Sequence, residues 1–304
     1  MTAQIPDALI RTVQVGAMSF SIQEMGEGPT VLCLHGFPDS AYTWRLLLPA
    51  LASAGYRAIA LTSRGYEPAS QPEGNDYSVP ALAGDVPALL DALEIPKCHL
   101  VGHDWGASIA FAVAAGYPER LSSLTALAVP HPAAFALTAA KDFGQLLRSW
   151  YIYYFQIKGR PEKVIRRRNF AFLERLWRNW SPYWTIPEAD LTAMKTTFSQ
   201  PGVLNAALEY YRQAYDSKHP RAQETLHLYS TVISAPTLGL TGATDGCISS
   251  EVFERSMPLA LFTGGLKRQR IEGAGHFLHL EAPDVVNSAI ISHLQSVDGR
   301  HRKR

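Results

Sequence analysis

The chain has 304 residues, which is enough to bury one large catalytic core, and its formal net charge of +1 gives no electrostatic argument for nucleic acid or an acidic partner. No apolar run approaches the roughly 20 residues of a membrane span. The N-terminus also lacks the basic-then-apolar pattern of a secretion signal. We therefore expect no nucleic-acid partner and no membrane partner.

Three cysteines, Cys33, Cys98 and Cys247, are too few for a disulfide framework and favour a reducing, cytoplasmic location. Cys33 and Cys98 lie in apolar, strand-like runs, so we expect them in the core. Cys247 is close to a candidate acid and is expected to line the site. The basic residues of 299–304 are interpreted as a disordered tail.

Strand and helix patterns alternate along most of the chain. Residues 12–23 predict a pair of strands, and residues 30–36 a buried strand that ends in a turn. Further expected elements are, in chain order, a helix over 40–55, a strand over 56–61, a helix over 79–93, a strand over 98–101, a helix over 107–115 and a strand over 121–129. This alternation predicts an α/β fold with a mostly parallel sheet covered on both faces.

The pattern changes between residues 132 and 230, which are aromatic, basic and helical in rhythm. Strands are expected again at 235–241 and 267–271, followed by a closing helix over 283–297. A separate helical domain is disfavoured because the sheet pattern resumes after this stretch. We expect residues 132–230 to form a helical lid, or cap, over a core made of residues 1–131 and 231–298.

The segment Gly102-His103-Asp104-Trp105-Gly106 joins a predicted strand to a predicted helix. Small residues on both sides of Asp104 have the spacing of a nucleophile elbow, in which serine is the usual occupant. A carboxylate is already anionic and suits attack on a saturated carbon, which would give an alkyl ester that water must then cleave. The alternative interpretation of Asp104 is an ordinary helix N-cap.

Two later segments supply partners for Asp104. Asp245 and His276 each follow a predicted strand, at the edge where open α/β sheets bind ligands. The order of nucleophile, acid and histidine matches an α/β-hydrolase triad, with His276 as general base and Asp245 orienting it. Taken singly, Asp245 could be a turn residue and His276 a core histidine. No zinc spacing or nucleotide loop is present, so we expect no metal and no cofactor.

The segment His35-Gly36-Phe37-Pro38 occupies the place where an oxyanion hole is usually completed. The backbone N–H groups of Phe37 and Trp105 are expected to point at a developing oxyanion. A cis peptide bond at Pro38 is expected to set this turn.

Together these segments resemble the epoxide hydrolases of the α/β-hydrolase fold, over nearly the whole chain. The resemblance implies that Tyr151, five residues before a Gln, and Tyr211, directly before an Arg, donate hydrogen bonds to the epoxide oxygen. The other interpretation of both tyrosines is aromatic packing within the lid. One departure from the family is the pair Thr62-Ser63 before Arg64, where many relatives carry Asp before the Arg.

The resemblance also suggests which residues surround the substrate. The expected pocket residues are His35, Pro38, Phe135, Trp150 and Trp177. We expect a small-molecule epoxide substrate, converted with water to a vicinal diol through an ester on Asp104. The chain is expected to be a monomer or a homodimer.

Other functions remain open at this point. A haloalkane dehalogenase would use the same triad, although Phe37 stands where many dehalogenases have Asn and the paired tyrosines have no role in halide release. A fluoroacetate dehalogenase is less favoured because the arginines expected after Asp104 are missing. A carboxylesterase is disfavoured because Asp replaces Ser. A binding protein on a hydrolase scaffold would retain no turnover.

Overall fold

A computed structural model describes residues 3–300 and contains one eight-stranded sheet with the order β1-β2-β4-β3-β5-β6-β7-β8. The strands β1 and β2 pair antiparallel, β2 pairs antiparallel with β4, and every other neighbouring pair is parallel. The strands are β1 (Leu9–Val15), β2 (Met18–Met25), β3 (Thr30–Leu34), β4 (Arg57–Leu61), β5 (Cys98–His103), β6 (Leu121–Leu127), β7 (Thr237–Gly242) and β8 (Leu266–Ile271). The predicted mostly parallel α/β fold is confirmed.

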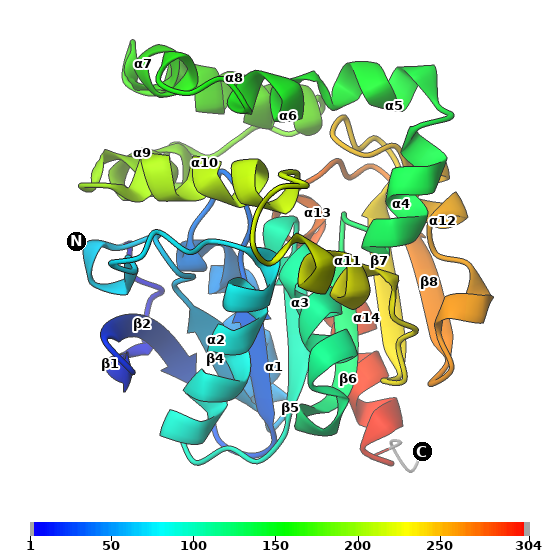
Figure 1. The fold of residues 1–304 in the computed structure, drawn as a ribbon. Coiled ribbons are helices and arrows are strands. Elements are labelled where there is room, and N and C mark those ends of the chain that lie inside the picture. Colours follow the sequence, from blue (N-terminus) through cyan, green and yellow to red (C-terminus); the bar gives the residue numbers. More distant parts are fainter. Residues whose placement is uncertain (1–2, 301–304) are drawn as a thin grey trace.

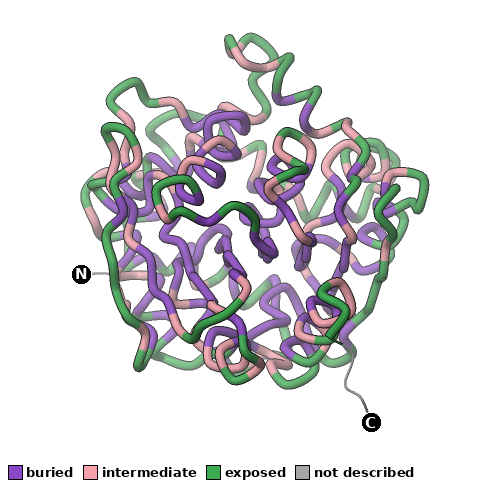
Figure 2. Tube along the Cα trace, turned by 90° about the horizontal axis from the view of Figure 1, so that it is seen from below, coloured by how far each residue is buried: buried purple, intermediate pink, exposed green. Residues whose placement is uncertain are grey.

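Helices cover both faces of this sheet (Figure 1). One face carries α2 (Val79–Ala92), α3 (Trp105–Gly116) and α11 (Ala222–Ser230), and the other carries α1 (Leu47–Ser53) and α14 (Pro283–Val297). Two hydrophobic clusters lie between these layers. Figure 2 shows the buried chain in the interior and the exposed chain at the periphery.

Burial follows the position of each strand in the sheet. The central strands β3 and β5 are buried along their whole length, as expected where helices cover both faces. The edge strand β8 instead exposes Lys267, Arg268, Gln269 and Arg270. Charged side chains on an edge oppose pairing with a further strand, so this edge is protected against aggregation.

Eight helices connect β6 to β7, and those from α5 to α10 lie across one end of the sheet (Figure 1). They are α4 (Pro132–Ala139), α5 (Phe143–Arg148), α6 (Trp150–Phe155), α7 (Arg160–Arg166), α8 (Ala171–Trp180), α9 (Glu188–Ser199), α10 (Val203–Ala214) and α11. We call residues 132–230 the helical insertion. Its first helix begins at Pro132 and its last helix ends at Ser230, and its role as a cap stays a prediction.

The prediction of a helix over 40–55 is wrong in its first half. Residues Ala41–Leu46 form a 3₁₀ helix, and α1 begins only at Leu47. The reason lies in Pro49, which has no N–H and so cannot donate to the carbonyl of Arg45 in an α-helical pattern. The tighter 3₁₀ turns carry the chain to the point where α-helical bonding can begin.

At the C-terminus, the Arg300 N–H donates to the Gln295 carbonyl at 2.8 Å, and the Arg300 guanidinium lies over the Tyr56 ring, 5.5 Å from its centre. The rest of the predicted tail, residues 301–304, lies outside the described residues. Among residues 3–300, no helix is both long and apolar enough to cross a membrane.

Candidate active site

Asp104 lies at the sharp turn between β5 and α3. Its backbone has φ 52° and ψ −120°, a conformation that L-residues rarely adopt and that costs on the order of 1–3 kcal/mol. Strain of this kind persists only where the surrounding structure enforces it, and it is concentrated at functional positions.

Two glycines make this turn possible. A Cβ added at Gly102 would collide with the Gly106 carbonyl, and one at Gly106 would collide with the Leu34 carbonyl at the end of β3. The small residues that flank Asp104 in the sequence are therefore required by close backbone approach. The elbow predicted for this segment is present in the structure.

One oxygen of the Asp104 carboxylate is held by a backbone donor. The Phe37 N–H donates to Asp104 Oδ1 at 2.7 Å, and the Phe37–Pro38 peptide bond is cis, as expected. Trp105 is the first residue of α3, so its N–H belongs to the donors that a helix start leaves without an intrahelical partner. This arrangement can stabilise negative charge on Oδ1.

The other oxygen faces His276. The distance from Asp104 Oδ2 to His276 Nε2 is 3.4 Å, and His276 Nδ1 lies 2.9 Å from Asp245 Oδ2. The second Asp245 oxygen accepts hydrogen bonds from the N–H groups of Cys247 and Ile248 at 2.7 and 3.0 Å. The structure thus brings Asp104, Asp245 and His276 together in the order expected, each buried and each just past the end of a strand.

The charge state of His276 is set by competing effects. Burial disfavours the imidazolium, but the carboxylates of Asp245 and Asp104 more than offset it and raise the pKa of His276 to about 10. With Asp104 ionised, His276 is therefore protonated at neutral pH. It becomes available as a base only when a neighbouring negative charge is removed.

Two phenols from the helical insertion approach the carboxylate of Asp104. The Tyr151 and Tyr211 rings are 5.9 Å apart between centres, and the Tyr211 ring packs edge-on against Phe37 and Trp105. Burial raises the pKa of both phenols well above the usual range, and the negative charge of Asp104 adds to this effect, so both keep their protons.

The Tyr211 hydroxyl lies beside the Trp105 indole without good hydrogen-bond geometry, and no other residue among 3–300 partners it. The Tyr151 hydroxyl lies 3.3 Å from Cys247 Sγ. A buried hydroxyl without a partner is uncommon in folded proteins and indicates a group that is available to bind a ligand.

Cys247 is held in place by its backbone. Its N–H donates to Asp245, and its carbonyl accepts a hydrogen bond from Gln145 Nε2 at 2.8 Å. The Cys247 sulfur, an Asp104 oxygen and a His276 nitrogen all lie within 4.8 Å of one another. The expectation that Cys247 lines the site agrees with this placement.

The five residues expected in the pocket occupy different environments. His35 Nδ1 contacts the Gly36 carbonyl at 3.0 Å, and His35 Nε2 accepts from the Ser63 N–H at 3.2 Å, so neither ring nitrogen is left for a ligand. Trp177 donates from its indole to the Pro38 carbonyl at 2.9 Å and is fully buried.

The other two expected pocket residues belong to the helical insertion. Trp150 is 43% exposed and packs against Tyr151, while Phe135 is partly buried against the larger hydrophobic cluster. The pocket role of all five residues stays a prediction.

A second buried histidine, His103, lies next to His276. His103 donates from Nε2 to the His276 carbonyl at 3.0 Å, and burial lowers the pKa of His103 to about 3, so it is neutral. The carbonyl fixes the His103 tautomer, because only a protonated Nε2 can donate to it. Asp39, His103 and His279 place a ligand atom each within 4.8 Å of the others, and burial raises the pKa of Asp39 to about 7.

The contacts between the helical insertion and the loop of His276 were not predicted from the sequence. The Trp180 carbonyl, at the end of α8, accepts from the N–H groups of both His276 and Gly246 at 3.1 and 2.9 Å. Ser181 donates to Glu281 at 2.6 Å, and Glu281 also accepts from the Gly275 N–H at 2.9 Å. A backbone carbonyl carries no sequence signal, and no motif singled out Glu281.

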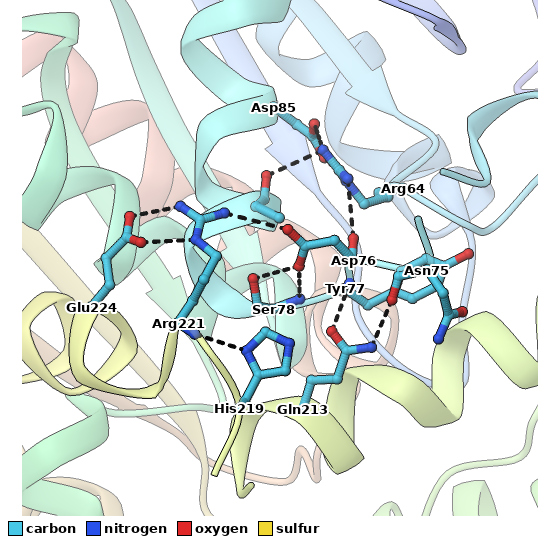
Figure 3. Close-up of polar contacts among 11 residues, drawn as sticks. Arg64, Asn75, Asp76, Tyr77, Ser78, Asp85, Gln213, His219, Arg221 and Glu224 are labelled. Carbon is cyan, nitrogen blue, oxygen red and sulfur yellow. Dashed lines mark hydrogen bonds and ion pairs between the residues drawn. The ribbon is translucent and has the colours of Figure 1, made fainter. Parts of the chain in front are cut away.

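Polar contacts also hold α10 of the helical insertion to the core (Figure 3). Gln213 of α10 donates to the Asn75 carbonyl and accepts from the Tyr77 N–H, both at 2.8 Å. Arg64 donates from Nε to Asp85 at 2.7 Å. The loop after β4 is therefore anchored on α2.

Comparison with known proteins places the chain in a family. Residues 29–283 match the family model for the alpha/beta hydrolase fold, so the chain belongs to that family of hydrolases. It is 34% identical to human epoxide hydrolase 4 over 274 residues, which cover 88% of this chain and 72% of that protein. Within the fold, the chain accordingly belongs to the epoxide hydrolases.

Two further similarities agree with this placement. The chain is 32% identical to the AB hydrolase superfamily protein YfhM of Bacillus subtilis, over 89% of this chain and 91% of that protein. The crystal structure of an epoxide hydrolase from Vigna radiata matches with a TM-score of 0.78 at 28% identity, over 97% of this chain and 100% of that chain.

Proposed function

We propose that this enzyme converts an epoxide and water to a vicinal diol through a covalent ester on Asp104, with the helical insertion acting as a cap over the site. The observation that carries the proposal is the Asp104 carboxylate, which lies 3.4 Å from the His276 imidazole and whose charge acts on two buried, protonated phenols, Tyr151 and Tyr211. Human epoxide hydrolase 4 and the Vigna radiata enzyme support the same reaction class by name.

In the first step, Tyr151 and Tyr211 donate hydrogen bonds to the epoxide oxygen. Oδ2 of Asp104 attacks a ring carbon, because Oδ1 is engaged by the Phe37 N–H. The carbon–oxygen bond of the ring breaks, and the alkoxide takes a proton from a phenol. The product is a hydroxyalkyl ester of Asp104.

In the second step, the ester is hydrolysed. Ester formation removes the negative charge of Asp104, so the pKa of His276 falls and the imidazolium releases its proton, which restores the phenol that was deprotonated in the first step. The neutral imidazole can then take a proton from water. The resulting hydroxide attacks the carbonyl carbon of the ester, and the N–H groups of Phe37 and Trp105 stabilise the oxyanion that forms on Oδ1. Collapse of this intermediate breaks the bond between the carbonyl carbon and the ester oxygen. The diol leaves with that oxygen and a proton from His276, and the new carboxylic acid of Asp104 returns a proton to His276. Asp245 orients His276 and stabilises the imidazolium.

A haloalkane dehalogenase would share the ester and the triad. A halide leaves without a proton, so that reaction gives the two phenols no role. Turnover of styrene oxide beside 1-chlorobutane, scored as diol and as chloride, separates the two activities. Faster chloride release than diol formation would favour the dehalogenase.

The ester itself is tested by a single turnover with excess enzyme in oxygen-18 water. The diol of the first turnover should carry oxygen-16 from Asp104, and label should appear in the diol only in later turnovers. Full labelling in the first turnover would mean direct attack by water and would exclude the ester.

The proposed compartment is the cytoplasm. All three cysteines are free and buried in the structure. Free thiols of this kind persist in a reducing environment.

A further inference from the structure

The proposed reaction gives no role to Cys247, although its sulfur lies among the reacting groups. The Cys247 sulfur, an Asp104 oxygen and a His276 nitrogen come from loops after β7, β5 and β8 and lie within 4.8 Å of one another. All three residues are buried. His276 Nε2 has no hydrogen-bond partner among residues 3–300, apart from the long 3.4 Å approach of Asp104.

These atoms form a donor set that suits a zinc-class ion. Thiolate, imidazole and carboxylate are the ordinary protein ligands of Zn²⁺, at about 2.3, 2.0–2.1 and 2.0–2.2 Å. In a tetrahedral site with such bond lengths, ligand atoms are about 3.3–3.7 Å apart. The 3.4 Å separation of Asp104 Oδ2 and His276 Nε2 already meets this requirement, and the sulfur needs a movement of only about 1 Å.

The surrounding contacts match those of known metal ligands. His276 is held through Nδ1 by the carboxylate of Asp245, as in carboxylate–histidine–zinc arrangements. The other Asp245 oxygen fixes the backbone of Cys247, so one residue orients two of the three ligands. A carboxylate and a thiolate together neutralise a divalent charge.

We propose that Asp104, Cys247 and His276 form a binding site for a thiophilic divalent cation such as Zn²⁺ or Cd²⁺, which occupies the site in competition with substrate. Binding forms a metal–sulfur bond and expels the thiol proton, together with any proton on His276 Nε2, to solvent. The bound ion engages the attacking carboxylate and the base at once. Metal binding itself does not depend on the proposed function, whereas inhibition of epoxide opening does.

The second cluster, Asp39, His103 and His279, offers no sulfur. A probe that detects the metal–sulfur bond therefore separates the two. Cadmium is such a probe, since a thiolate bound to Cd²⁺ gives an ultraviolet charge-transfer band that carboxylate and imidazole ligands do not produce.

The experiment titrates chelator-treated enzyme with CdCl₂ and measures the Zn²⁺ Kd by competition with a chromogenic chelator. The parent should give the charge-transfer band with a stoichiometry of one. Cys247→Ala should abolish the band and weaken Zn²⁺ binding by at least roughly 100-fold, because loss of an outer-shell partner alone costs 10–100-fold. Cys247→Ser serves as a second variant that keeps a hydroxyl beside Tyr151, and it should also lose the band.

Cys98→Ala is the matched control, because Cys98 is equally buried at the opposite end of β5. It should keep the band and the parental Kd. A band that survives in Cys247→Ala, or no band in the parent, would overturn the proposal. A charge-transfer band without turnover of any epoxide would support the metal site and count against the proposed function. Turnover of an epoxide without the band would support the proposed function and count against the metal site.

Discussion

Replacing Asp104 with asparagine is expected to lower the pKa of His276. In the native protein, burial disfavours the imidazolium, but the two neighbouring carboxylates more than offset burial and hold the pKa at about 10. The substitution removes one of these negative charges and retains a side chain of the same shape.

The size of the effect follows from the 3.4 Å distance between Asp104 Oδ2 and His276 Nε2. At an effective dielectric constant of 20, two unit charges at this distance attract by about 5 kcal/mol. Because one pKa unit corresponds to about 1.4 kcal/mol, this loss is enough to carry the titration of His276 down to neutrality. The amide oxygen can still accept a hydrogen bond, so the figure is an upper limit.

The assay is an NMR titration of protein with isotope-labelled histidine, after intact-mass measurement has shown that the amide is present. We expect the His276 ring signals of Asp104→Asn to titrate far below those of the parent. Asp91→Asn is the control, because Asp91 is an exposed acid whose charge lies outside the site. If His276 of Asp104→Asn still titrated near the parental value, a charge on Asp104 would not govern the base. The ester would then not switch His276 to its neutral form.

Three further predictions test the site and its support. His276→Gln should form the ester but not release it, so intact-mass measurement after epoxide addition should show enzyme plus one substrate; turnover at the parental rate would place the base elsewhere. Tyr151→Phe and Tyr211→Phe should each slow ester formation by roughly 10²–10⁴ in rapid-mixing assays, the range typical of acid assistance, whereas Tyr153→Phe, at a 64% exposed position, should change the rate little. Arg64→Ala should lower the free energy of unfolding in urea by about 3–5 kcal/mol, because Asp85 is left buried without its partner. Arg178→Ala, in an exposed pair, should lower it by less than about 1 kcal/mol. Equal losses would show that burial of the Arg64 pair is not decisive.

The parts of the site that could be predicted from sequence are those set by local backbone geometry. Asp104 was recognisable because the elbow requires small residues on both sides, and the collisions at Gly102 and Gly106 are the physical cause of that requirement. Asp245 and His276 were recognisable because each follows a strand, and parallel strands bring their carboxyl ends to one edge of the sheet.

The parts that could not be predicted depend on how separate loops meet. Cys247 was expected to line the site because it lies two residues after Asp245, but its grouping with Asp104 and His276 was not, since only the path of that loop brings the three side chains together. Their spacing along the chain resembles no zinc motif, so a search by spacing does not find them. The anchor of Arg64 on Asp85 depends in the same way on the packing of the loop after β4 against α2.

The link between the helical insertion and the base, His276, also depends on how separate loops meet. The Trp180 carbonyl accepts from the N–H groups of His276 and Gly246, so one atom at the end of α8 contacts the loops that carry both the base and its acid. The Trp180 ring also packs against His276 and Tyr151, at 5.0 and 5.1 Å between ring centres. A shift of α8 would therefore move the phenol and the imidazole together. In the proposed reaction, the phenol acts while the ester forms and the imidazole acts while it is hydrolysed, so a shared support keeps both aligned with Asp104.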